Sequence, residues 1–334
     1  MIGVTGPRAQ DLRYWLSSQR GPAIAAALFV AMFALFVTEH PAGLSADVVN
    51  TAANKGALLA FVAMAQTLPV LTAGIDLSVG SVFVMTNCLA STLCAGTPSQ
   101  VALGVAIVLA IGLVCGALNG LVVVLGRLQP IIATLATGAI YHGVALWLRP
   151  APGGEINESF ADFVTGSVGD AVPFSIVVLF AAVVLVWIPY RRSVLGRAAY
   201  AVGSSEQAAY MSGVPVARAK FLAYVLAGLF AAIAGLLLTC LTYSGEANAL
   251  LGGGYTLSSI AAVVVGGTSL YGGSGGAIGT IFGAFVLRTI SDLLFVFDMD
   301  PLSQPLFLGV VLLVAVSLGS FRLLKVKQRV DLYR

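Results

Sequence analysis

Ten separate stretches of this sequence are long, apolar and nearly free of charge, and they constrain the fold more than any other feature. Each approaches the about 20 residues that a helix needs to cross a hydrocarbon layer about 30 Å thick. Backbone amides find no water inside that layer, so each stretch must satisfy its own hydrogen bonds as a helix. The predicted spans are residues 22–38, 54–73, 77–95, 101–124, 130–148, 174–189, 221–243, 256–270, 276–295 and 303–320.

The scarcity of charge excludes a soluble globular protein. Only 9% of the residues are charged and 59% are hydrophobic, whereas soluble domains carry about 25% charged residues. The sequence therefore predicts an all-α polytopic membrane protein in which residues 1–334 form one transmembrane domain. The cysteines lie in apolar stretches without a CxxC pair, so we expect small buried side chains and no metal site or disulfide. They are Cys88, Cys94, Cys115 and Cys240.

Basic residues gather in three places that ten spans put on the same side of the membrane. The positive-inside rule makes this side the cytoplasm, with both termini inside. The 149–173 loop then falls outside, and it is acidic. The start of the chain resembles a signal peptide, but no A-x-A site follows its apolar run, which favours a retained first helix. The basic residues are Arg8, Arg13 and Arg20; Arg191, Arg192, Arg197, Arg218 and Lys220; and Arg322, Lys325, Lys327 and Arg329.

Two breaks rich in glycine and serine interrupt the apolar pattern. The first break, residues 74–80, reads GIDLSVG, and the second break, residues 266–276, reads GGTSLYGGSGG. Spans two to five also resemble spans seven to ten in length. Paired interrupted segments are typical of inverted repeats with a transport pathway between them. Glycine is also common in membrane helices for close packing alone, so the sequence leaves both explanations open.

Neither a catalytic set nor a nucleotide-binding loop is present in the sequence. The two histidines, His40 and His142, are far apart, and no HExxH or GxSxG motif occurs. We therefore expect a transport subunit and no enzyme, with no metal or cofactor in this chain. The sequence also lacks GxxxxGK[ST], so transport driven by ATP would require a motor, with its ATP and Mg²⁺, on a separate chain.

The basic loop 190–220 predicts a short helix between two spans. Ser204 or Ser205 can cap a helix that begins near Glu206, whose carboxylate suits a helix N-terminus. Gly213 can end this helix, and Pro215 prevents its continuation. The helix is either an ordinary solvated connector or a coupling helix that docks on a motor subunit.

This loop resembles the cytoplasmic docking segment of ABC importer permeases, in which Glu, Ala and Ala are followed by Gly. More narrowly, the chain is similar to the permease family for ribose, xylose, arabinose and galactofuranose, which also includes autoinducer-2 permeases. Four stretches carry the resemblance in the family's order: residues 71–81, 129–135, 196–213 and 260–280. The chain departs from many relatives at Ala73-Gly74 and at Pro130-Ile131, and the second departure bears on substrate choice. The loop residues assigned to ATPase coupling are Gly196, Arg197, Gly203, Glu206, Ala208, Ala209 and Gly213.

The resemblance implies a fold like that of the vitamin B12 importers, in a bacterial inner membrane. It also implies three kinds of partner: an ATPase with two nucleotide domains, a periplasmic or lipid-anchored sugar-binding protein, and a second permease chain, identical or sister. A nucleic-acid partner is not expected. The implied function is translocation of a monosaccharide or related small polar solute. The alternative is a stand-alone secondary transporter or facilitator, which would need paired charges at mid-membrane, and the sequence offers few.

Polar residues within the apolar spans are candidates for the solute pathway or gate. Asp76 either caps the helix that follows the first break, through Ser78 and nearby amides, or lines the pathway. Arg288 and Asp292 are four residues apart and are expected to pair, while Lys55 is expected to reach a membrane edge. The alternative for each hydroxyl or amide is a bond to its own helix or to a neighbouring helix. The candidates are Asp76, Ser78, Asn87, Asn119, Thr134, Thr137, Ser258, Thr268 and Ser269.

Overall fold

The computed structural model describes residues 20–169 and 172–300, together with scattered positions of one to three residues between 303 and 317. Within this part the chain is predominantly helical, which confirms the predicted class of fold. The predicted span at 303–320 lies outside the described residues apart from those scattered positions. Asp170 and the basic residues before residue 20 and after residue 320 also lie outside them.

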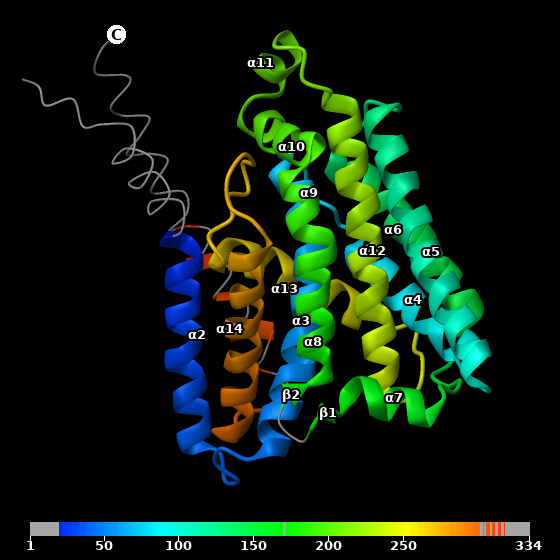
Figure 1. Ribbon diagram of the computed structural model, residues 1–334, viewed down its shortest axis with the longest axis vertical. Helices are drawn as coiled ribbons and strands as arrows, with labels where there is room; N and C mark the ends of the chain where they lie inside the picture. The colour runs from blue at the N-terminus through cyan, green and yellow to red at the C-terminus, as the bar shows by residue number, and fades with distance from the viewer. Residues whose placement is uncertain are drawn as a thin grey trace, which may run out of the picture.

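In chain order, two series of long helices are separated by a short connector. The first series consists of α2 (Arg20–Glu39), α3 (Ala46–Leu71), α4 (Val79–Leu93), α5 (Pro98–Val124) and α6 (Pro130–Leu148). The connector holds α7 (Glu158–Thr165) and a two-stranded antiparallel sheet, β1 (Ser167–Val168) with β2 (Val172–Pro173). The rest are α8 (Phe174–Ala182), the π-helical turn η1 (Val183–Trp187), α9 (Ile188–Arg192), α10 (Val194–Ser204), α11 (Glu206–Met211), α12 (Val216–Thr242), α13 (Ala249–Val265) and α14 (Ala277–Val296). In space the two series interleave, since α2 packs on α14 and α5 packs on α12 (Figure 1).

Seven helices in the described part are long and apolar enough to cross a membrane. They are α2, α3, α5, α6, α12, α14 and the continuous run α8–η1–α9. The π-helical turn lies just before Pro189, which cannot donate a backbone hydrogen bond to the ladder. Large apolar side chains such as Trp147 and Leu185 face outward, 82% and 72% exposed. Such surfaces suit a lipid environment, and the chain is a polytopic membrane protein.

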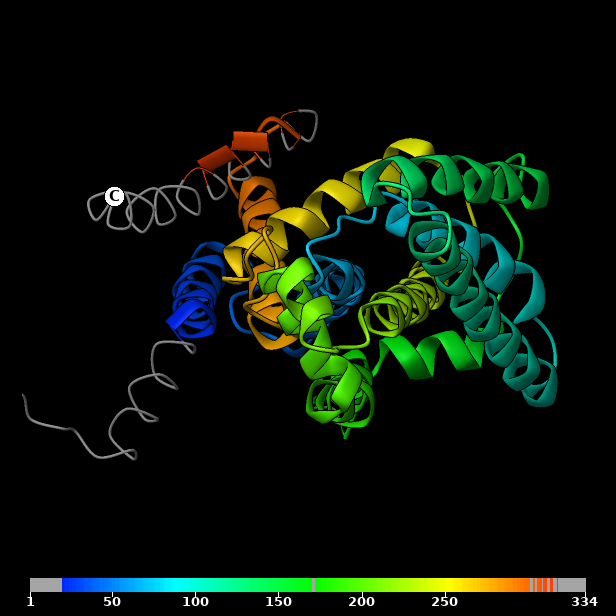
Figure 2. The same ribbon diagram turned by 90° about the horizontal axis from the view of Figure 1, so that it is seen from above.

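Helix α3 lies at the centre of the bundle (Figure 2). In its most apolar stretch of 18 residues, 72% of the residues are buried. α12, α14, α13 and α8 pack around it, whereas α2 lies beyond α14 at one edge and α5 with α6 at the other (Figure 1). α4 packs between α12, α6 and α13. The first break therefore joins the most buried helix to a short helix held on several sides.

Helix boundaries differ from the predicted spans where polar caps extend a helix. α3 begins eight residues before the predicted start because the Ser45 hydroxyl accepts a hydrogen bond from the Val48 N–H at 3.3 Å. α13 begins at Ala249, not at residue 256, because Asn248 Oδ1 accepts from the Leu251 N–H at 3.0 Å. α13 also ends at Val265, which leaves residues 266–270 in the second break. Hydropathy alone does not detect these caps.

The two breaks meet at the end of the bundle that carries α10 and α11. The Gly273 N–H donates to the Leu71 carbonyl at 3.2 Å, which brings the second break to the end of α3. An inverted repeat would place corresponding breaks at opposite ends of the bundle. These two breaks therefore do not form an inverted pair, and the repeat itself stays a prediction. The acidic helix α7 lies at the other end, opposite α11 (Figure 1).

Candidate coupling and translocation site

Helix α11 is the short capped helix that the sequence predicts. Ser205 is its N-cap, and the Ser205 hydroxyl accepts from the Ala208 N–H at 3.3 Å. Glu206 occupies the first turn, and its carboxylate binds Lys220 of α12 at 2.6 Å. Helix α11 ends at Met211, and Gly213 follows with a φ of 75°, a left-handed conformation that favours glycine.

The exposed tip of α11 consists of residues that the sequence argument missed. Ala208 is exposed as expected, but Ala209 is buried against Val202 and Ala219. Ala209 therefore holds α11 onto α10 and α12 and does not face a partner. Tyr210 and Met211 are 75% and 80% exposed instead, at the projecting end of the molecule (Figure 1). Tyrosine and methionine are enriched at protein interfaces, a signal that the loop sequence already contained.

A glycine contact joins α10 to the end of α3, just before the first break, and to the second break. Gly203 lies so close to its neighbours that a Cβ there would overlap the Leu71 carbonyl oxygen and the Gly273 nitrogen. A Cβ on Gly272 would come within 2.8 Å of both the Ala73 nitrogen and the Gly203 Cα. We call Leu71, Gly203, Gly272 and Gly273 the glycine contact. Three backbone segments touch here with no side chain between them.

Tyr200 adds a hydrogen bond to the same junction. Its hydroxyl donates to the Gly275 carbonyl at 2.9 Å. Burial raises the pKa of the Tyr200 hydroxyl, so the proton that makes this bond is retained at neutral pH. Gly196, at the other end of α10, packs on the Tyr190 carbonyl with no room for a side chain. Arg197 is exposed and donates to the Arg192 carbonyl at 2.7 Å.

The first break contains a buried aspartate that is fully engaged. Asp76 is only 2% exposed, and its Oδ1 accepts from the Ser78 N–H at 2.8 Å and from the Ser78 hydroxyl at 2.6 Å. Asn119 of α5 donates to the Ser78 hydroxyl at 2.7 Å and to Asp76 Oδ2 at 3.4 Å. These bonds fix the turn that leads into α4, whose N-cap is Ser78, and the choice between a capping and a pathway role for Asp76 stays a prediction.

Three further polar side chains complete what we call the break cluster. Thr134 of α6 accepts from the Leu77 N–H at 2.9 Å. The Tyr141 hydroxyl donates to Asn119 Oδ1 at 3.1 Å. The Gln66 amide of α3, oriented with its nitrogen toward the Asp76 carbonyl, donates there at 2.8 Å and accepts from the Asp76 N–H at 3.2 Å. The break cluster is Gln66, Asp76, Ser78, Asn119, Thr134 and Tyr141.

The other predicted pathway residues do not join the break cluster. Asn87 binds the Thr239 hydroxyl at 2.9 Å and the Ser244 carbonyl at 3.1 Å, which ties α4 to the end of α12. Thr137 donates to the carbonyl of its own helix at Thr134, at 3.3 Å. Ser258 is half-buried on α13. Thr268 and Ser269 close the second break through bonds from the Gly276 and Tyr271 N–H groups.

Three other charged residues within the helices, Lys55, Arg288 and Asp292, form one cluster near the end of the bundle away from α11. The Arg288 guanidinium donates to Asp292 Oδ1 at 2.7 Å, which confirms the expected pair. Lys55 reaches the same oxygen at 3.8 Å. Among the described residues, no three His, Cys, Asp or Glu side chains gather closely enough to hold a metal ion.

Comparison with known proteins identifies the protein family. Residues 48–316 match the family described as the permease component of the branched-chain amino acid transport system, and the chain belongs to this family. It is 38% identical to the ribose import permease protein RbsC of Bacillus subtilis over 272 residues, or 78% of this chain and 81% of that protein.

Two further relatives extend over most of the chain. Identity is 32% to the fructose import permease protein FrcC of Rhizobium meliloti, across 93% of this chain and 88% of that protein. The chain is 34% identical to the autoinducer 2 import system permease protein LsrC of an Enterobacter species, across 85% of this chain and 82% of that protein. No solved structure matches the chain.

Proposed function

We propose that this chain is the membrane permease subunit of an ATP-binding-cassette importer that carries a monosaccharide or related small polar solute from a binding protein to the cytoplasm. The observation that carries the proposal is the glycine contact, which joins α10, the helix next to the exposed α11, to the end of α3 and to the second break. The names of the relatives, importers of ribose, fructose and autoinducer 2, support the solute class.

Three partners complete the proposed machine, in a bacterial inner membrane with both termini of the permease inside. An ATPase with two nucleotide domains binds α11, with Tyr210 and Met211 in its cleft and ATP and Mg²⁺ held on that chain. A sugar-binding protein docks at the opposite end, near α7. A second permease chain, identical or sister, faces this one across the pathway.

The proposed mechanism is a shift between two populations of conformations. Closure of the ATPase displaces α11 and α10, and the glycine contact passes that displacement to the end of α3 and the second break. The break cluster then exchanges some of its internal hydrogen bonds for bonds to the solute. Hydroxyls and amides suit a neutral sugar, which must bind weakly enough to leave.

Reconstitution tests the proposal directly. We expect this chain in proteoliposomes to import radiolabelled monosaccharide only with the partner ATPase, the binding protein and ATP. Ion gradients without ATP should give no uptake, because the proposed permease takes its driving force from the partner ATPase. As a control, the ATPase is replaced by a variant that binds but does not hydrolyse ATP. Solute uptake should then stop after at most one transport cycle.

Two outcomes would contradict the proposal. Uptake by this chain alone, without nucleotide, would instead support a facilitator or secondary transporter. Labelling of a single cysteine at Gln207 from the periplasmic side, in a variant without the native cysteines, would place α11 on the wrong side for an ATPase.

Reversing the charge at Glu206 tests whether α11 is a docking element. Glu206→Arg should abolish uptake while the protein still inserts, because the exposed carboxylate becomes a cation at the docking surface. Co-purification of the ATPase should fall by about tenfold or more, since like charges placed at an interface cost several kcal/mol. Membrane yield and uptake are measured in the same cells.

A charge swap provides the matched control. Glu206→Lys combined with Lys220→Glu keeps an ion pair within the chain but reverses the charge presented to a partner. Restoration of uptake by this double variant would show that Glu206 only steadies α11, and would overturn its role in docking.

A further inference from the structure

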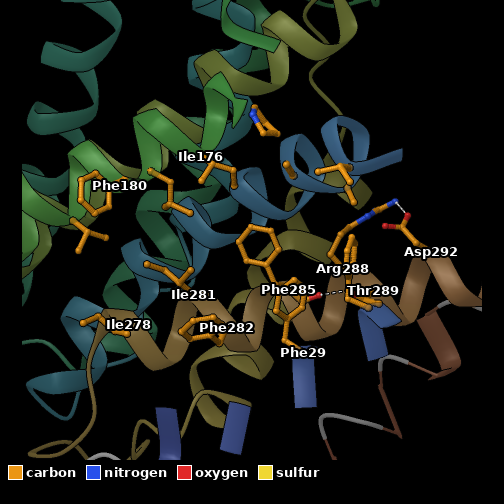
Figure 3. Close-up of a pocket in the computed structure, with 17 residues that line it drawn as sticks. Phe29, Ile176, Phe180, Ile278, Ile281, Phe282, Phe285, Arg288, Thr289 and Asp292 are labelled. Carbon is orange, nitrogen blue, oxygen red and sulfur yellow. Dashed lines mark hydrogen bonds and ion pairs between the residues drawn. The ribbon is translucent and has the colours of Figure 1, made fainter. Parts of the chain in front are cut away.

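A large apolar groove lies on the side of the bundle between α2, α3, α8 and α14. Its volume is about 600 Å³, within the about 300–1,000 Å³ that is usual for small-molecule sites. Phenylalanines from three helices line it, including Phe29, Phe180, Phe282 and Phe285 (Figure 3). The groove is separate from the break cluster and from α11, and nothing in the proposed transport cycle uses it.

One end of this groove is charged. Arg288 and Asp292 lie there and are joined by the bond marked in Figure 3. Lys55 shares the same Asp292 oxygen, so one carboxylate serves two cations and the formal sum is one positive charge. The buried Nε of Arg288 has no hydrogen-bond partner among the described residues. An excess cation with a spare N–H is costly in a membrane unless an anion accompanies it.

We propose that the groove binds a phospholipid with a negatively charged headgroup. One acyl chain lies among the phenylalanines, and the phosphate accepts hydrogen bonds from Arg288 and attracts Lys55. A guanidinium suits a phosphate because its N–H groups match the spacing of two oxygens. An apolar cavity open to a bilayer fills with hydrocarbon, since water inside it would lack partners.

The depth of the charged end agrees with a headgroup. Arg288 is eight residues before Val296, the last residue of α14, or about 12 Å along the helix. Its long side chain extends further toward that end. Lys55 is nine residues after Ala46, the first residue of α3, or about 14 Å. Because α3 is longer than the about 30 Å hydrocarbon layer, its first turns project beyond it. Both cations therefore lie in the half of the bilayer away from α11, and their side chains extend toward Asp292, one turn of α14 nearer the interface.

Native mass spectrometry of the full chain tests the proposal. The protein is purified from nanodiscs that hold equal amounts of phosphatidylglycerol and phosphatidylcholine, and the retained lipids are counted. We expect one phosphatidylglycerol per chain, preferred by about tenfold or more, because phosphatidylcholine places its own choline cation beside two protein cations whereas phosphatidylglycerol carries a net negative charge. Arg288→Met should remove the preference, whereas Arg218→Met, a matched change near α11, should leave it intact.

A second pair of variants tests the position of the acyl chain. Ile281→Trp fills the groove and should abolish lipid retention. Leu185→Trp places the same side chain on an outward face, 72% exposed and outside the groove, and should have no effect. Equal retention of the two lipids by the unmodified chain would overturn the proposal. So would retention that survives Ile281→Trp, or a lipid-free dimer formed through this groove.

Discussion

Gly203→Ala should reduce solute uptake by about tenfold or more in an otherwise folded permease. The added methyl group overlaps the Leu71 carbonyl and the Gly273 nitrogen, which are backbone atoms and cannot rotate away. Overpacking of this kind costs about 1–3 kcal/mol. The strain falls where α10 meets the end of α3 and the second break, so it alters the balance between the two conformations of the pathway. Uptake by reconstituted complex, measured per unit of inserted protein, reports the effect.

The coupling between ATP hydrolysis and transport separates this result from simple misfolding. Gly203→Ala should still bind the ATPase, and ATP should still be hydrolysed without solute movement. Val194→Leu, which enlarges an exposed side chain at the start of the same helix, should leave uptake unchanged. Normal, tightly coupled transport by the Gly203 variant would show that the glycine contact does not pass on motion.

Asp76→Ala should be the most destabilising single substitution in the first break. It leaves the Ser78 amide and hydroxyl without their buried acceptor and removes a contact from Asn119. A buried donor left without its acceptor costs about 1–3 kcal/mol, and two donors of Ser78 lose theirs, so a loss of about 3 kcal/mol or more in the free energy of unfolding is expected. Uptake should be lost as well, because the turn into α4 is no longer fixed.

The chain's own cysteines make the loss of stability in Asp76→Ala measurable. All four are free and buried, so a thiol-reactive dye reports their exposure as the protein unfolds with temperature. Asp76→Asn retains one acceptor oxygen and should lose less stability than Asp76→Ala. Thr86→Ala is the matched control, since this buried hydroxyl bonds only carbonyls of its own helix. An unfolding temperature for Asp76→Ala equal to that of Thr86→Ala would refute the structural role.

Local signals in the sequence predicted the local parts of the site. A capping serine, an acidic first turn, a glycine and a proline were enough to place α11, because each acts within a few residues. The glycine contact was beyond such reasoning. It joins Leu71, Gly203 and Gly272, and no local pattern states that these three positions meet. The burial of Ala209 likewise depends on Val202 and Ala219, which approach it only in the folded chain.

Polar residues in apolar helices were the hardest to interpret from the sequence. Asn87 and Asn119 look alike there, since each is a single amide in a long apolar run. The structure separates them by their partners: Asn119 meets the first break, whereas Asn87 binds α12. Amides hold membrane helices together as readily as they contact solutes. Only the packing of distant helices decides between the two roles.

The short lengths of α4 and α13 reduce the barrier that a solute has to cross. With 15 and 17 residues, they extend at most about 23 and 26 Å, less than a hydrocarbon layer about 30 Å thick. Beside them the chain runs through the two breaks instead of regular helix. If the proposed pathway follows these helices, the solute gives up its hydration over a distance shorter than the surrounding bilayer, and the proposed ATPase has correspondingly less work to do.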